Sequence, residues 1–286
     1  MTGADEVALV AAELDRRRGE FELHHDPRAA FAYIYVALTR SLEVQLRQAD
    51  TGFDDPEWVA DLATALAHEY FTAMDAVDQA LGAARATPRG VPSARAFRGE
   101  VPQPWRDVQA AFGRRSYVLE DVLFSMTAHI SYDLPIALQR MAPVATHVAD
   151  FHRMNDVLGT AVEGVQDGLA ERYSRGLAVL DKVFARQDEL FSNYGIRAAR
   201  GLAWFNADRL LDPSGSADAL DSIRRSAGAF IREVRSPDDW RLRLVLGIAR
   251  FLVPERRRWP DSPGSGPPAE QTRVARAASI SDELPG

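Results

Sequence analysis

The sequence contains no cysteine, and this absence removes several kinds of site at once. Without thiols the chain has no disulfide, no thiolate zinc site, no iron–sulfur cluster and no cysteine nucleophile. Lysine is nearly absent too, because Lys182 is the only one among the 34 basic residues and the other 33 are arginines. These arginines alternate with acidic residues along the chain, which is typical of solvated helix faces. We therefore expect no nucleic-acid partner.

Long apolar runs and glycine-rich phosphate loops are also missing. No stretch approaches the roughly 18 uncharged apolar residues that a transmembrane helix needs, so we expect no membrane span. The first 20 residues include Asp5, Glu6 and Glu13 and have no long apolar core. That composition does not fit a secretory signal, and we expect a cytoplasmic protein. The glycines match no phosphate-binding fingerprint.

What the sequence does contain is apolar residues at helical spacing almost throughout, with hardly any strand-like alternation. The 286 residues are 46% apolar, which is enough for one sizeable hydrophobic core. We therefore predict an all-α protein, a multi-helix bundle. The helices are expected at about 5–18, 27–48, 54–86, 105–114, 117–141, 148–172, 174–194, 196–211, 217–234 and 236–252.

The domain organisation follows from where this periodicity stops. Residues 1–253 are predicted to form a single helical domain. Residues 254–286 hold six of the 16 prolines and lack apolar density, which predicts a disordered proline-rich tail. Residues 87–104, rich in proline and glycine, are expected to form a long loop of the kind that often serves as a lid or binding segment. Pro135 should kink the helix that contains it or end it early.

The densest polar stretch on an apolar helix contains His129 and Asp133. Their spacing of four residues places both side chains on one face of a helix. A second pair with the same spacing follows at His152 and Asp156. Helical bundles build metal sites from histidines and carboxylates that face inward from several helices, and such ligands suit zinc, iron or manganese. Further ligands could come from His68, Glu69 and Asp75 on the helix expected at 54–86, and from Asp150 just before the second pair.

Two chemical interpretations of this stretch remain open. With a divalent metal, His129, Asp133 and Asp150 are ligands, and a bound water is the nucleophile for hydrolysis. Without one, His129 is a general acid or base oriented by Asp133, and Asn155 holds the substrate. An isomerisation, an elimination or a cyclisation would fit that second version. A serine hydrolase is disfavoured because no glycine-flanked nucleophile elbow is present.

A non-catalytic interpretation is equally compatible with the spacing. A histidine and a carboxylate one turn apart often form a buried, hydrogen-bonded strut to which nothing binds. The protein would then be a helical binding or scaffold protein in which a polar network fixes helix register. Substitution separates the two hypotheses, because a strut residue mainly affects stability and an active-site residue mainly affects activity.

Aromatic residues are concentrated in the first half of the chain, where most are expected to be core. Small-molecule pockets are largely apolar with a few polar groups, so some of these rings should line the substrate site. Trp105 directly follows the long loop, and Tyr117 lies close behind it. The expected pocket residues are Tyr70, Trp105, Tyr117 and Tyr132.

Residues 125–138, which read Ser-Met-Thr-Ala-His-Ile-Ser-Tyr-Asp-Leu-Pro-Ile-Ala-Leu, resemble the central motif of domain-of-unknown-function family 5995. This is a family of helical bacterial proteins. Three more segments are similar to family segments in the same order, at 31–39, 69–73 and 150–158. Together the resemblance covers about residues 25–170.

The resemblance implies a helical fold and singles out polar positions, although the family name assigns no activity. It leaves residues 171–253 as a helical extension. Thr127 and Ser131 stand where the family usually has asparagines, and Ser125 replaces a glycine, so this chain is expected to differ in its ligand. The polar positions that match the family pattern are His129, Asp133, Asp150 and Asn155.

Overall fold

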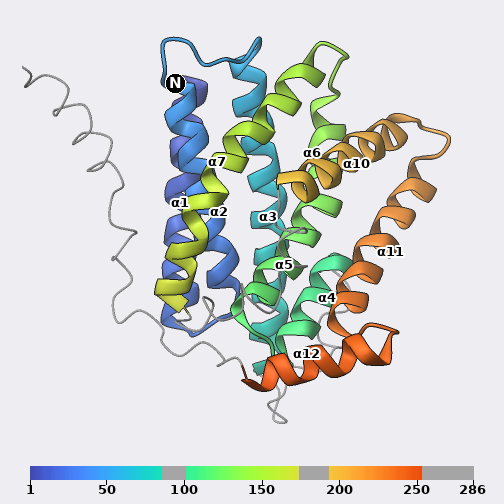
Figure 1. Ribbon diagram of the computed structural model, residues 1–286. Coiled ribbons are helices and arrows are strands. Elements are labelled where there is room, and N and C mark those ends of the chain that lie inside the picture. Colours follow the sequence, from blue (N-terminus) through green and yellow to red (C-terminus); the bar gives the residue numbers. More distant parts are fainter. Residues whose placement is uncertain (86–100, 174–192, 253–286) are drawn as a thin grey trace, which may run out of the picture.

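The computed structural model describes residues 1–85, 101–173 and 193–252, and these ranges contain helices and no strand. The all-α prediction is therefore confirmed (Figure 1). The loop predicted at 87–104 lies mostly outside the described residues, and most of the helix predicted at 174–194 does too. The tail at 254–286 lies wholly outside them. None of the described helices is long and apolar enough to cross a membrane.

The first three helices are α1 (Gly3–Leu23), α2 (Arg28–Leu46) and α3 (Pro56–Arg85). Helix α1 begins with a capping box, in which Thr2 Oγ1 accepts from the Asp5 amide and Asp5 accepts from the Thr2 amide, at 3.3 and 3.0 Å. Helix α3 begins where the sequence predicts, and Asp55 Oδ1 accepts a hydrogen bond from the Trp58 amide at 3.0 Å. These caps satisfy amides that have no partner inside the helix.

The central rod consists of α5 (Val118–Ala128), the π-helical segment η1 (His129–Asp133) and α6 (Leu134–Met141). The rod continues past Pro135 to Met141, so the helix does not end early as one alternative predicted. The wider π turn lies just before the proline, and the Leu134 amide bonds to the His129 carbonyl five residues earlier. Because proline has no amide hydrogen and collides with the preceding turn, this local widening accommodates it. Single π turns occur frequently at functional sites.

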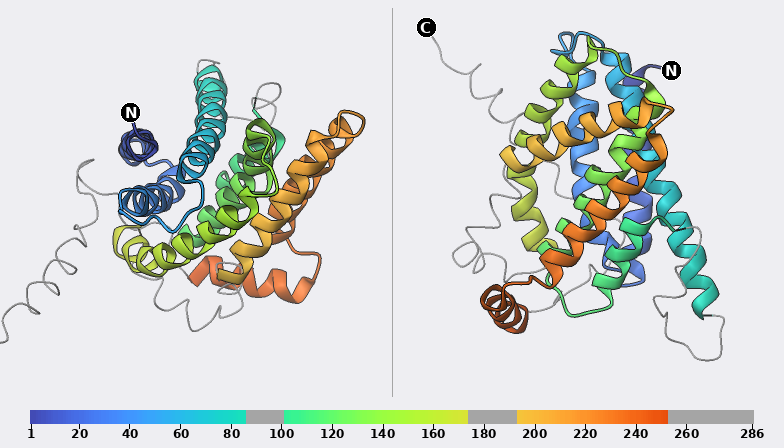
Figure 2. Two further views of the ribbon diagram at one scale, coloured as in Figure 1. Left: turned by 90° about the horizontal axis from the view of Figure 1, so that it is seen from above. Right: turned by 90° about the vertical axis from the view of Figure 1, so that its right-hand side faces the viewer.

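The remaining helices surround this rod. They are α4 (Gln103–Phe112), α7 (His147–Tyr173), α10 (Asn193–Leu211), α11 (Ser216–Arg235) and α12 (Trp240–Leu252). Helix α7 packs across α2, α10 packs against α6 and η1, and α11 packs against α4 and α5. Figure 2 shows α12 end-on beside bundle helices that are seen lengthwise, so α12 lies across the lower end of the bundle.

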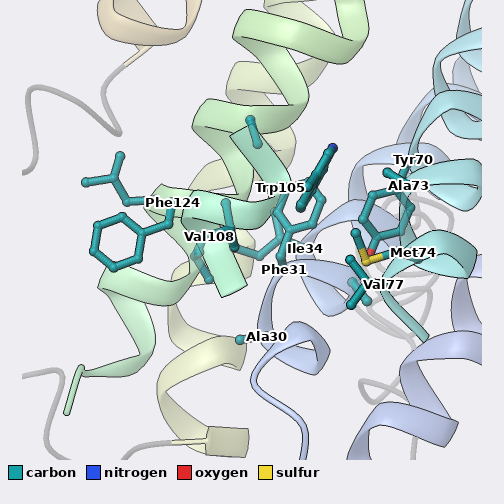
Figure 3. Close-up of a cluster of buried hydrophobic side chains, with 14 of the residues drawn as sticks. Ala30, Phe31, Ile34, Tyr70, Ala73, Met74, Val77, Trp105, Val108 and Phe124 are labelled. Carbon is teal, nitrogen blue, oxygen red and sulfur yellow. The ribbon is translucent and has the colours of Figure 1, made fainter. Parts of the chain in front are cut away.

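The hydrophobic core has two parts, and η1 lies at their boundary. The larger part is formed mainly by α1 to α5 and α11, and Figure 3 shows Trp105 of α4 and Phe31 of α2 near Tyr70 of α3. The smaller part is formed mainly by α2, α3, α6, α7 and α10 and includes Leu134. Within η1, Tyr132 belongs to the larger part, and Ile130 packs on the smaller one. His129 and Asp133 of η1 are buried among these apolar side chains.

Candidate functional site

The polar centre of the bundle is a chain of three buried side chains. His129 Nδ1 lies 3.0 Å from Asp133 Oδ2. Trp105 Nε1 donates to the same carboxylate and lies 3.0 Å from Oδ1 and 3.2 Å from Oδ2. His129 is 6% exposed, and Asp133 and Trp105 are each 1% exposed. The structure therefore confirms that His129 and Asp133 share one helix face, and it adds Trp105 from α4.

This geometry assigns roles to the two imidazole nitrogens of His129. A carboxylate only accepts hydrogen bonds, so Nδ1 carries the proton that it donates to Asp133. In the neutral ring Nε2 then holds the lone pair, and no described residue forms a hydrogen bond with it. A neutral imidazole with a fixed Nδ1–H and a free Nε2 is the arrangement that a general base requires.

The carboxylate of Asp133 is buried away from solvent. Burial raises the pKa of Asp133, and the hydrogen bonds from His129 and Trp105 offset part of that increase. If Nε2 accepts a proton, the resulting imidazolium forms directly beside this carboxylate. In surroundings of low polarity the attraction between the two charges is stronger than in water. The pair is thus arranged to stabilise a positive charge that forms on His129.

Three aromatic rings enclose His129. The ring centroids of Tyr35, Phe31 and Tyr70 lie 4.6, 5.5 and 5.8 Å from that of the imidazole. The hydroxyl of Tyr70 is buried without a hydrogen-bond partner in the structure. Burial raises the pKa of both tyrosines, and the nearby charge of Asp133 adds to the increase for each. Both hydroxyls therefore remain protonated near neutral pH and can act as hydrogen-bond donors.

His129 also lines a cavity of about 100 Å³. Its walls come from α2, α3, the central rod, α7 and α10, and most of its lining side chains are aliphatic. No aspartate or glutamate lines it, and the side chains with polar groups are Tyr35, Thr39, His129 and Arg200. Ligand sites in proteins commonly combine apolar walls with a few convergent polar groups. The aliphatic lining residues are Ile34, Leu38, Leu42, Val59, Leu62, Ala63, Leu66, Ile130, Leu134 and Leu158.

The other predicted site residues are placed differently. Tyr70 and Trp105 reach the His129–Asp133 pair, as just described, but neither lines the cavity. Tyr117 and Tyr132 are buried in the larger part of the core and do not line it either. Asn155 contributes only indirectly, because its Oδ1 accepts a hydrogen bond from Arg200 Nε at 2.7 Å.

Asp150 is not part of the His129 site. Its two carboxylate oxygens accept hydrogen bonds from the amides of Asp54 and Asp55, at 2.8 and 2.7 Å, just before α3 begins. The predicted ligand set of His129, Asp133 and Asp150 is therefore not brought together. Among the residues that the structure describes, no group of three or more histidine, aspartate and glutamate side chains is placed to hold a metal ion.

The other potential ligands are also dispersed. His152 and Asp156 are exposed on α7, and Asp156 forms an ion pair with Arg197. On α3, His68 is exposed, and Glu69 pairs with Arg140 of α6. Asp75 is exposed too, and it binds Arg17 of α1 at 2.6 Å. The second histidine–carboxylate pair is thus a surface feature and does not face the first.

The position of Asp150 leads to a stability prediction. Asp150→Asn should lower the free energy of unfolding by about 2 to 3 kcal/mol, because an amide can accept from only one of the two backbone N–H groups and hydrogen bonds to a charged group are strong. Urea unfolding followed by circular dichroism measures this change. Asp156→Asn on the exposed face of the same helix is the control, and an equal loss in both variants would contradict the capping role.

Sequence reasoning missed three of the four polar side chains that line the cavity, Tyr35, Thr39 and Arg200. The signal for Arg200 was present. Ile196, Arg200, Ala203 and Ala207 recur at helical spacing and are all buried, so the arginine interrupts an otherwise apolar stripe. Tyr35 carried no such signal, because an aromatic residue on an apolar helix face usually belongs to the core.

The fold and the site together define a class, an all-α bundle in which a buried histidine–aspartate pair borders an apolar cavity. The sequence matches the model of the family of unknown function DUF5995 over residues 7–88 and 91–237. The chain belongs to this family. The match extends beyond residues 25–170, which contain the family-like segments, and it includes Arg200. No curated protein and no solved structure matches the chain.

Proposed function

We propose that this protein is an enzyme that acts on a small organic substrate in the cavity, with His129 as its general acid–base. The observation that supports the proposal most directly is the position of the His129 ring. It lines an apolar cavity while its Nδ1 is held by a fully buried carboxylate. Asp133 is a positioning residue in this proposal, because it fixes the tautomer and does not touch the cavity.

The reaction that this arrangement suits is a proton transfer at a substrate atom. Nε2 takes the proton, Asp133 stabilises the imidazolium that forms, and the same nitrogen returns the proton elsewhere on the substrate. Isomerisation, elimination and cyclisation all include such a proton transfer. The hydroxyl of Tyr35, which lines the same cavity, is a hydrogen-bond donor for a substrate oxygen that gains charge.

One observation favours the alternative of a non-catalytic binding or scaffold protein. Asp133 accepts hydrogen bonds from His129 on its own rod and from Trp105 on α4, so it joins two helices. A structural strut would do the same. In that case the cavity would either bind a ligand without transforming it or bind no ligand.

Turnover by matched histidine variants tests the proposal. Purified protein is incubated with a panel of small acids, esters, ketones and alcohols, and products are detected by mass spectrometry. Product formation should disappear in His129→Gln and persist in His152→Gln, which replaces an exposed histidine on α7. Circular dichroism verifies that both variants fold. Undiminished turnover in His129→Gln would refute the acid–base role. An inactive wild type with a destabilised His129→Gln would support the strut.

A further inference from the structure

One residue that lines the cavity is a buried cation, and no carboxylate of the described residues is paired with it. Arg200 is 5% exposed, and its guanidinium lies 4.3 Å from the ring centroid of Phe151. Nε donates to Asn155 and one Nη donates to the Phe151 carbonyl at 3.1 Å, both of which are neutral acceptors. The other Nη has no hydrogen-bond partner among the described residues. No described carboxylate forms an ion pair with Arg200.

The other arginines of the described core show what is unusual here. Arg18 and Arg28 are equally buried, and each is paired with carboxylates. Arg18 binds Glu22 at 2.8 Å, and Arg28 binds Asp26 at 2.7 Å. Removing a charge from water costs several kcal/mol, which a partner of opposite charge normally offsets. Burial alone lowers the pKa of Arg200 to about 10, so the guanidinium is still charged near neutral pH.

The uncompensated charge is located where a ligand would be. Arg200 and His129 line the same cavity, which has no acidic side chain in its wall. A bound anion would therefore supply the negative charge that Arg200 lacks among the described residues. It would also find a planar guanidinium already oriented by Asn155 and Phe151.

We propose that the cavity binds a small organic acid whose carboxylate pairs with Arg200, and that its short apolar body fills the space lined by His129. This inference rests on the proposed function, since it names the substrate class of that site. A guanidinium and a carboxylate carry one charge each, of opposite sign, and can form two parallel hydrogen bonds. A phosphate dianion would be better matched by two permanent cations, and among the described lining residues Arg200 is the only arginine.

The size of the cavity limits the apolar body. An engineered cavity of roughly 150 Å³ in another protein holds benzene, and the space here is about 100 Å³. The ligand body is therefore a short or branched chain, or a ring that is admitted after small side-chain movements. The aliphatic walls offer it no hydrogen bonds, so orientation depends on the carboxylate.

Binding of matched acids and amides tests the proposal independently of turnover. The probes are butanoate, hexanoate, octanoate and benzoate, each compared with its own amide and with the corresponding alkyl phosphate or amine. Ligand-observed NMR at neutral pH measures the affinities. Wild type should bind at least one acid about tenfold or more tightly than its amide, as expected for a charge-assisted bidentate pair. Arg200→Met should lose that preference while it still binds the amide.

Two controls keep the result interpretable. Arg200→Lys keeps the charge but loses the planar fork, and it should bind the acid with intermediate affinity. Arg197→Gln replaces an exposed arginine one turn earlier on α10 and should bind like wild type. The proposal is overturned if acid and amide bind equally to wild type, if Arg200→Met binds the acid like wild type, if the phosphate or amine is preferred, or if no probe binds.

The outcomes also separate this inference from the proposed function. Acid binding that requires Arg200, without turnover, would uphold the ligand class and reject the enzyme. Turnover that requires His129, without a preference for acids, would uphold the enzyme and reject the ligand class.

Discussion

Replacing Glu22 by alanine is expected to lower the free energy of unfolding by about 3 to 5 kcal/mol. The carboxylate of Glu22 is fully buried between α1 and α7 and accepts from Arg18 at 2.8 Å and from Arg172 at 2.7 Å. The Tyr173 hydroxyl donates to it as well. Without Glu22, the buried guanidinium of Arg18 keeps only Asp15, and Arg172 loses the ion pair.

Thermal and urea unfolding measure this effect, with Glu20→Ala as the control. Glu20 pairs with Arg16 on the exposed side of α1, so its removal should change stability by less than about 0.5 kcal/mol. The Glu22 variant should melt roughly 10 °C lower than wild type. Similar melting temperatures for both variants would show that the buried network contributes little.

The same network should have a distinct pH dependence. Burial acts to raise the pKa of Glu22, but Arg172, Tyr173 and Arg18 outweigh it and hold the pKa below its ordinary 4.5. A carboxyl group with a depressed pKa in the fold stabilises the protein above its unfolded pKa, and it loses this effect as the pH falls through the folded pKa. The stability difference between wild type and Glu22→Gln should therefore shrink below about pH 4.5.

Asp133→Asn should remove most of the activity and little of the stability. An asparagine keeps one oxygen for Trp105 but presents an NH₂ group to His129 Nδ1, which must then accept a hydrogen bond. The ring proton moves to Nε2, and the nitrogen that served as the base becomes a donor. In a serine protease the equivalent change costs about 10⁴-fold in rate, and we expect a loss of about 10³- to 10⁴-fold here.

Nitrogen NMR of histidine side chains tests this prediction without a substrate. Wild type should show His129 as the Nδ1–H tautomer, and Asp133→Asn should show it as Nε2–H; the His129→Gln spectrum identifies the resonance among the six histidines. Stability should change by no more than about 1 to 2 kcal/mol, because the shape is kept and a desolvated charge is removed. Asp156→Asn, with the same spacing from exposed His152, is the control. An unchanged tautomer would refute the orienting role of Asp133.

The sequence alone determined the helices and the central pair. Apolar spacing predicted an all-α bundle, and the Asp55–Pro56 signal placed the start of α3. The His129–Asp133 contact was predictable because residues four apart on a helical segment are neighbours whatever surrounds them. Local interactions of this kind are encoded within a turn or two of chain.

Only the tertiary structure decided which role each polar residue has. Asp150 matched the family pattern like Asp133, yet it binds amides 95 and 96 residues away at the start of α3. Trp105 donates a hydrogen bond to Asp133. Tyr35 on α2 and Arg200 on α10 line the cavity. The spacing of residues along one helix fixes the face on which they lie, but not which helix packs against that face. Helix packing made that choice, and with it the composition of the site.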